Sequence, residues 1–268
     1  TEHPFTINFS RDDVRITTNY HADLVASSLY SVVHEGGHAL YELHVGRELS
    51  RTCLGGGVSM AIHESQSRFY ENIIGRSRAF CGIIYPWLRE HFAPRLDDVS
   101  SEDFYRMINK AQPSLIRTEA DELTYCLHIM VRYELERRMF AGELTAHDLP
   151  AQWNRLYKAY LGVDVPNDRE GILQDSHWAN GNIGYFPSYA IGSAYGAQYL
   201  RQMQKDFDVS AAVATGRLTQ INCWLEDKIW KYGCMKDPTP LFESVCGPFD
   251  PTCYTAYLRD KFTEVYGL

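Results

Sequence analysis

The feature that most constrains how this chain can fold is a set of apolar residues that recur at helical spacing near its N-terminal end. These residues lie between about His21 and His44: Leu24, Val25, Leu29, Val32, Val33, Leu40 and Leu43. Residues three or four positions apart share one face of an α-helix, so the segment predicts an amphipathic helix that buries that face. We expect this helix to stop near Gly46.

Helical patterns also dominate the remainder of the chain. They occur in five further segments: 60–74, 115–139, 189–207, 218–230 and 251–266. We expect a break or kink near Pro86, because proline removes a backbone donor and clashes with the preceding turn. Ser100 and Ser101 are suitable caps for a short additional helix.

Two segments do not follow the helical pattern. In residues 5–20, alternating residues such as Val14 and Ile16 favour one or two short strands. Residues 162–184 are rich in Gly, Asp and Asn, which is typical of a functional loop. The sequence therefore predicts a mainly α fold, one compact unit over residues 1–268, with a small antiparallel β element near the N-terminus.

Composition and charge exclude several classes of protein. With 45% hydrophobic and 22% charged residues the chain is ordinary globular material, and disorder is not expected. The net charge is −8 and the basic residues are scattered, so we expect no nucleic-acid partner. No apolar run reaches the roughly 18 residues of a membrane helix, so we expect no membrane association. The seven cysteines show no Cys-x-x-Cys spacing, which argues against a thiolate zinc site and favours a reducing, cytoplasmic location.

A metal-binding pattern lies inside the first predicted helix. His34 and His38 flank Glu35 in the arrangement His-Glu-x-x-His. On a helix both imidazoles share one face and can reach one zinc ion, while Glu35 lies beside it as a general base. The bland alternative is a pair of ordinary helical histidines. Gly36 and Gly37 each cost about 1 kcal/mol relative to alanine in a helix, so we expect either a close backbone approach or tight helix packing there.

A catalytic zinc site usually has three protein ligands and one open position. Glu64, on the next predicted helix after a glycine-rich connection, is our choice for the third ligand. The neighbouring His63 is the alternative, because adjacent helical residues point about 100° apart and only one of them can face the metal.

Several short motifs together resemble the thermostable carboxypeptidase family named for the Thermus aquaticus enzyme. The motifs are His3-Pro4-Phe5, Asp13-Val14-Arg15-Ile16-Thr17, His34-Glu35-Gly36-Gly37-His38, His63-Glu64-Ser65-Gln66, Ile116-Arg117-Thr118-Glu119-Ala120-Asp121 and Gly171-Ile172-Leu173-Gln174-Asp175-Ser176-His177-Trp178. The resemblance implies a helical, gluzincin-like zinc-peptidase fold with a deep groove. It also implies cytosolic homodimers that remove single residues from peptide C-termini. Family chains are about twice as long, so we expect this chain to be the C-terminal, catalytic half of a longer one.

The predicted chemistry is hydrolysis of peptides with a free C-terminus. Zinc, or cobalt in its place, would be held by His34, His38 and Glu64, with Glu35 as the general base. Related gluzincin-like peptidases place a His and a Tyr at the oxyanion. We therefore expect catalytic donors among His177, Tyr185 and Tyr189, although tyrosines commonly pack in cores instead.

Recognition of a free carboxylate favours a guanidinium. Arg117 and Arg15 compete for this substrate-binding role. Alternatively, Arg117 forms an i,i+4 ion pair with Asp121 on a long helix, and Arg15 closes the end of the groove. Asp121, Gln174 and Asp175 are candidates for orienting the metal ligands.

Two other functions fit the same residues. One is an oligopeptidase or dipeptidyl carboxypeptidase with the same zinc site, because the exopeptidase assignment depends on a single arginine. The other is a non-catalytic helical scaffold that binds zinc. Retention of Glu35 argues against the scaffold, since a structural zinc site has no use for a base.

Overall fold

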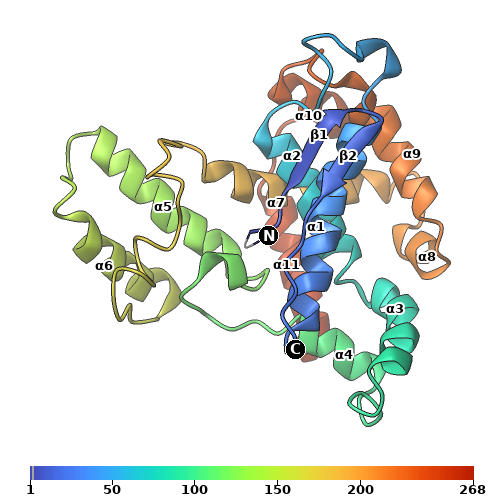
Figure 1. Cartoon of the computed structure of the whole chain (residues 1–268), viewed down its shortest axis with the longest axis horizontal. Coiled ribbons are helices and arrows are strands. Elements are labelled where there is room, and N and C mark those ends of the chain that lie inside the picture. Colours follow the sequence, from blue (N-terminus) through green and yellow to red (C-terminus); the bar gives the residue numbers. More distant parts are fainter. Residues whose placement is uncertain (2) are drawn as a thin grey trace. The chain divides into compact units, whose positions relative to one another are not determined.

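The structure of the protein, a computed structural model, describes residues 1 and 3–268 and consists mainly of helices (Figure 1). Near the N-terminus, strands β1 (Thr6–Ser10) and β2 (Asp13–Ile16) form an antiparallel hairpin. Thr6 pairs with Ile16, and the register is irregular between Asn8 and Ser10. A mainly α fold with a small antiparallel β element is thus confirmed.

The chain divides into two compact units. The first consists of residues 1–108 and 191–268, and the second of residues 109–190. Helix α7 (Pro187–Met203) begins in the second unit and enters the first at Ile191. The two compact units do not exclude a single catalytic unit over residues 1–268, because residues of both units can serve one reaction. That single catalytic unit stays a prediction.

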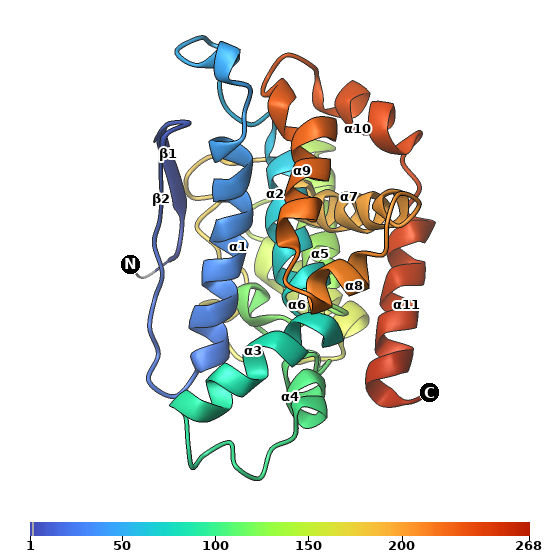
Figure 2. The same cartoon turned by 90° about the vertical axis from the view of Figure 1, so that its right-hand side faces the viewer.

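In the first unit the hairpin lies along helix α1 (Val25–Leu43), which in turn packs against α2 (Met60–Arg68) (Figure 2). A π-helix (Phe69–Ile74) continues directly from α2. Gly37 allows the two helices to approach, because a Cβ there would lie 2.7 Å from both Gln66 O and Ser67 Cα. A Cβ on Gly36 would meet nothing within 4 Å. Tight helix packing therefore accounts for Gly37 and not for Gly36.

The other elements of the first unit complete its core. They are η1 (Arg47–Leu49), α3 (Arg78–His91), α4 (Ser101–Ile108), α8 (Val209–Ala214), α9 (Leu218–Lys228), η4 (Trp230–Tyr232), α10 (Pro238–Cys246) and α11 (Thr252–Tyr266). Tyr41, Ile62, Phe69, Tyr199 and Trp230 lie fully buried in the largest apolar cluster. The cluster includes side chains of both α1 and α2, so its close packing holds the two helices in place.

The second unit is built on two packed helices, α5 (Tyr125–Phe140) and α6 (Leu149–Leu161). A short turn, η3 (Arg117–Glu119), precedes them, and the expected irregular stretch 162–184 follows. Val131, Leu135, Trp153 and Tyr157 form the core between the helices. The long loop is therefore anchored on a rigid pair of helices.

Some boundaries differ from the predicted ones. The first helix begins at Val25, not His21, and the long helix begins at Tyr125, not Leu115. The Asp121 carboxylate accepts hydrogen bonds from the backbone N–H and the hydroxyl of Thr124, a turn that delays the helix start. Arg117 and Asp121 therefore do not share a helix, and the predicted i,i+4 pair between them is wrong.

Three helices were not anticipated from the sequence: α6, α8 and α10. Proline stands in the first turn of both α6 and α10, where its missing N–H costs nothing. These prolines are helix-start signals that also fit a loop, which is why the pattern alone did not reveal the helices.

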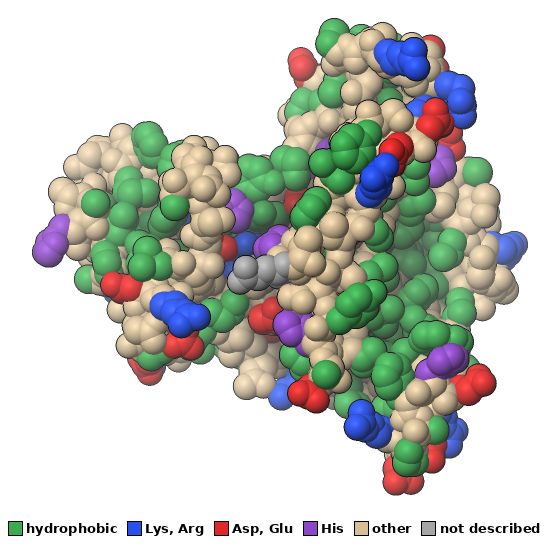
Figure 3. Space-filling model, viewed as in Figure 1, with side chains coloured by type: hydrophobic (Ala, Val, Ile, Leu, Met, Phe, Trp, Pro, Cys, Tyr) green, Lys and Arg blue, Asp and Glu red, His purple; other side chains and the backbone are tan. Residues whose placement is uncertain are grey.

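The distribution of charged and apolar side chains can be followed on one face of the molecule in Figure 3. Lys and Arg side chains are scattered over the face shown in Figure 3 without merging into a stripe. Within residues 1 and 3–268, no helix combines the length and the apolar character needed to cross a membrane.

Candidate metal centre

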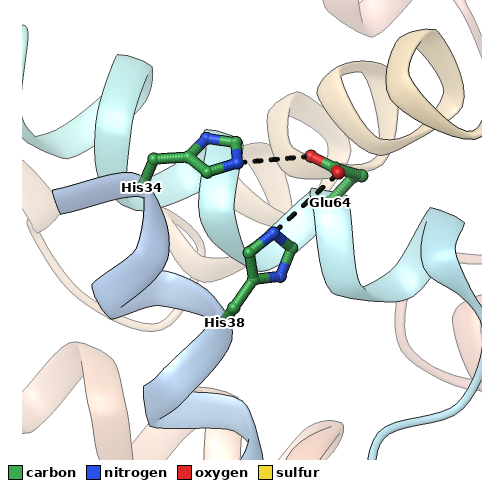
Figure 4. A group of neighbouring side chains, drawn as sticks. All are labelled: His34, His38 and Glu64. Carbon is green, nitrogen blue, oxygen red and sulfur yellow. Dashed lines mark ion pairs between the residues drawn. The ribbon is translucent and has the colours of Figure 1, made fainter. Parts of the chain in front are cut away.

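Three side chains from two helices converge on one point in the first unit (Figure 4). His34 and His38 lie one turn apart on α1, and Glu64 projects from α2. His34 Nε2 lies 3.7 Å from Glu64 Oε2, and His38 Nε2 lies 3.8 Å from Glu64 Oε1. One ligand atom from each residue lies within 4.8 Å of the others. Two imidazoles and a carboxylate at this spacing fit a divalent ion such as zinc.

The structure places Glu64, and not His63, in this group. Glu64 is buried, and one of its carboxylate oxygens accepts a hydrogen bond of 3.0 Å from Ser67 Oγ. Helix α7 presses against the same residue, because a Cβ on Gly192 would lie 2.4 Å from Glu64 Cβ. Packing on two sides therefore fixes the direction of the Glu64 side chain.

Glu71, on the π-helix, contacts the first histidine of the group. His34 Nδ1 lies 2.9 Å from Glu71 Oε2, and Arg68 and Arg76 pair with the same carboxylate. Burial opposes the charge of Glu71, but Arg68, His34 and Arg76 outweigh it and hold its pKa far below the usual range. An ionised Glu71 accepts a hydrogen bond from the Nδ1–H of His34. The lone pair of His34 Nε2 is then free to face the metal site beside Glu64.

The two histidines have opposite electrostatic environments. Burial lowers the pKa of His34, but the hydrogen bond to Glu71 and the charges of Glu64 and Glu71 outweigh it and raise the pKa overall. Burial lowers the pKa of His38 well below its usual range, and the charge of the neighbouring His34 adds to this. His38 is therefore held as the neutral imidazole, the form that binds a metal.

Glu35, the predicted base, is buried beside the hairpin. The Thr6 hydroxyl of β1 lies 2.6 Å from Glu35 Oε2 and 3.0 Å from the Glu35 carbonyl oxygen. Thr6 thus engages one carboxylate oxygen and orients the side chain. Nothing in the sequence pattern signalled this contact, because it joins a strand to a helix 29 positions away.

Arg15 lies on β2 with its side chain 66% exposed. Its Nε and Nη2 each donate to the Asp13 carboxylate at 2.8 Å. Its guanidinium also lies over the Phe9 ring, 5.0 Å from the centroid. The predicted substrate carboxylate would therefore meet a guanidinium that already has an acidic partner.

In the second unit the three predicted oxyanion residues form one cluster. His177 Nε2 lies 3.0 Å from the Tyr189 hydroxyl. The rings of His177 and Tyr185 are 5.3 Å apart, and those of Tyr185 and Tyr189 are 5.4 Å apart. The structure therefore brings these residues together.

Arg117 is buried in the same unit. Its Nε and Nη2 donate to Asp175 Oδ1 at 3.0 and 2.7 Å, and its Nη1 donates to the Tyr125 hydroxyl. Arg132, which no sequence motif indicates, donates to Asp175 Oδ2 and to Gln174 Oε1. Burial opposes the charge of Asp175, but the two arginines outweigh it and lower its pKa.

The predicted role of Asp121, Gln174 and Asp175 as partners of the metal ligands is not what their hydrogen bonds indicate. Gln174 accepts a hydrogen bond from the backbone N–H of Arg117, and Asp175 accepts one from the Arg132 side chain. Asp121 accepts one from the backbone N–H of Thr124. In the first unit, Glu71 and His63 contact the ligand histidines instead. Glu71 lies seven positions after Glu64, and helical periodicity over those seven positions is the sequence signal that could have revealed it.

Comparisons with known proteins place this chain among metallopeptidases. It is 43% identical over 268 residues to Carboxypeptidase 1 of Bacillus subtilis, covering 99% of this chain and 54% of that protein. It is 44% identical over 262 residues to Thermostable carboxypeptidase 1 of Pyrococcus furiosus, covering 97% of this chain and 52% of that protein. The chain thus spans about half the length of the curated relatives it matches.

Solved structures agree in fold. An M32 carboxypeptidase from Deinococcus radiodurans R1 superposes with a TM-score of 0.97 at 42% identity, covering 100% of this chain and 55% of that one. Trypanosoma cruzi metallocarboxypeptidase 1 superposes with a TM-score of 0.92 at 38% identity, covering 97% of this chain and 55% of that one. The family described as Carboxypeptidase Taq (M32) metallopeptidase matches residues 1–262. The chain therefore belongs to the carboxypeptidase Taq (M32) metallopeptidase family.

Proposed function

We propose that this chain carries the catalytic centre of a zinc metallocarboxypeptidase that removes single residues from the free C-termini of peptides. The observation that carries the proposal is the convergence of His34, His38 and Glu64 on one point, with Glu35 next to His34 on the same helix. Membership of a metallopeptidase family supports the same reading. Cobalt is the alternative metal.

When bound, a zinc ion supplies the Lewis acid for amide hydrolysis. Glu35 takes a proton from the attacking water and later gives it to the leaving amine. Thr6 donates a hydrogen bond to Glu35 Oε2 and so helps to hold the carboxylate that accepts this proton. His34 and His38 would hold the metal through Nε2, the atoms that face Glu64, and Glu64 would hold it through its carboxylate.

Five further residues belong to the proposed site. His177, Tyr185 and Tyr189 are our candidates for stabilising the oxyanion, supported by the hydrogen bond and ring contacts within their cluster. Arg117 and Arg15 are our candidates for the substrate carboxylate. Arg117 uses three of its five N–H donors on Asp175 and Tyr125, which leaves two for a ligand.

The wider setting is also proposed. We infer a cytoplasmic protein that forms homodimers as part of a longer chain. The chain has an odd number of cysteines and no spacing typical of a disulfide framework, which supports the cytoplasmic location. The resemblance to the thermostable carboxypeptidases supports the dimer.

The test uses one peptide made with a free and with an amidated C-terminus, incubated with the zinc-loaded 268-residue chain. We expect mass spectrometry to show stepwise loss of single residues from the free form only. Cleavage inside both forms would indicate an oligopeptidase, and release of dipeptides would indicate a dipeptidyl carboxypeptidase. If neither form is cut although zinc is bound, the chain acts as a zinc-binding scaffold.

A second experiment tests the base. Glu35→Gln should lower kcat by about 10² to 10⁴ with zinc content unchanged, because general acid–base catalysis contributes that much. Glu48→Gln, at an exposed carboxylate on η1, is the matched control and should keep full activity. Full activity in Glu35→Gln would refute the proposed mechanism.

A further inference from the structure

His63, the rejected alternative ligand, occupies a defined position beside the metal centre. Its Nδ1 lies 3.3 Å from His38 Nδ1, and its Nε2 lies 2.8 Å from Glu42 Oε1. Glu42 belongs to α1, one turn after His38. A carboxylate, an imidazole and a ligand imidazole therefore form a continuous chain of contacts.

The hydrogen-bond partners assign the protons for a neutral His63 ring. Glu42 Oε1 also accepts the backbone N–H of Gly57 at 3.0 Å, so this oxygen acts as an acceptor. His63 Nε2 is then the donor to Glu42, and in the neutral ring Nδ1 is left as an acceptor. His38 consequently donates from Nδ1 and keeps the lone pair of Nε2, the atom that faces Glu64.

The surroundings of His63 form a close-fitting cradle. Asn8 on β1 donates from Nδ2 to Glu42 Oε2 at 2.7 Å, so both carboxylate oxygens are engaged. A Cβ on Gly57 would lie 2.3 Å from His63 Nε2 and 2.6 Å from Tyr41 Cε1, so only glycine leaves room for the ring. The Tyr41 and His63 rings contact each other at 4.8 Å. A strand, two helices and a loop therefore hold this imidazole in one orientation.

We propose that His63, anchored by Glu42, is a positioning residue that sets the tautomer and orientation of the metal ligand His38. The two ligand histidines are thus supported differently: Glu71 contacts His34 directly, whereas Glu42 reaches His38 only through a second imidazole. This inference deepens the proposed function and rests on the metal centre assigned there.

The experiment measures the affinity of the purified chain for Zn²⁺ by competition with a chromophoric chelator. His63→Phe removes both ring nitrogens and should weaken Zn²⁺ binding by about 10-fold to 100-fold, the usual effect of losing such a partner. His63→Asn places an amide oxygen near the former Nδ1 position and should recover part of the affinity. Glu42→Gln keeps the shape and removes the charge, so we expect a loss of about 10-fold.

One control variant and one spectroscopic measurement separate a positioning role from a general effect on folding. His91→Phe changes an exposed histidine of α3 and should leave the Zn²⁺ affinity unchanged. The visible absorption spectrum of the Co²⁺-loaded chain should change in His63→Phe and return toward that of the wild type in His63→Asn. If His63→Phe does not fold, Glu42→Gln decides.

The outcomes are distinct. Unchanged Zn²⁺ affinity and an unchanged Co²⁺ spectrum in the folded His63 and Glu42 variants would overturn the positioning role while leaving the metal centre intact. Failure of the wild-type chain to bind Zn²⁺ would contradict the metal centre itself.

Discussion

The two glycines between the ligand histidines offer a matched pair of substitutions. Gly36→Ala and Gly37→Ala place the same methyl group on adjacent residues of α1. Each gains about 0.5 to 1 kcal/mol from the higher helix propensity of alanine. Because this gain is common to both variants, the difference between them isolates the contact that the methyl group makes.

The structure predicts the sign and size of that difference. At Gly36 the methyl group meets nothing within 4 Å, so the variant should be more stable than the wild type by the propensity gain alone. At Gly37 it would lie 2.7 Å from Gln66 O and Ser67 Cα, which are backbone atoms that move only with α2. Overpacking of this kind costs about 1 to 3 kcal/mol, so Gly37→Ala should be less stable than Gly36→Ala by that amount.

The assay is urea unfolding of the metal-free chain, monitored by circular dichroism. A chelator is present so that bound metal does not add stability. We also expect Gly37→Ala to bind Zn²⁺ more weakly than Gly36→Ala, because a displaced α2 carries Glu64 away from the histidines. Equal unfolding free energies for the two variants would refute the packing argument.

Three further measurements test the burial of His128, the hydrogen bond of Thr6 and the packing of Gly192. Burial lowers the pKa of His128 to about 3, so below its unfolded pKa near 6.5 only the unfolded chain takes up this proton. Stability should therefore fall from pH 6.5 toward 3 by up to about 1.4 kcal/mol per pH unit, with a smaller slope in His128→Gln when both are unfolded in urea. Thr6→Val should lower kcat about 10-fold or more at unchanged zinc content, since a hydrogen bond to charged Glu35 is worth about 1.5 to 3 kcal/mol; Thr6→Ser, assayed alongside, should retain activity. Gly192→Ala should weaken Zn²⁺ binding in chelator competition, whereas Gly196→Ala, whose nearest contact would be 3.4 Å, should not.

The metal-binding group could be predicted because its geometry is local. His34 and His38 are one turn apart on a helix that the apolar spacing predicted, and Glu64 follows on the next helix. The periodicity of a helix determines which residues share a face, whatever the remainder of the fold does.

Contacts between distant segments could not be predicted in the same way. The apolar pattern predicts a helix at Arg117, but this residue lies on a short turn and pairs with Asp175, 58 positions away. Arg132 meets the same carboxylate from α5. Such pairs depend on how a loop folds back onto its unit, and no periodic signal in one sequence encodes that.

The position of the ligands along the chain has a consequence for the order of folding. His34, His38 and Glu64 all lie in α1 and α2, two consecutive α-helices whose connection contains η1. Contacts between segments this close in sequence close short loops and form early, since little chain entropy is lost. A ribosome that has made residues up to Ile74 has therefore already supplied the ligand set and Glu71, before any of residues 109–190 exists. Gly192, which packs against Glu64, is synthesised much later. The orientation of Glu64 in the metal site would therefore become fixed only after α7 has packed against α2.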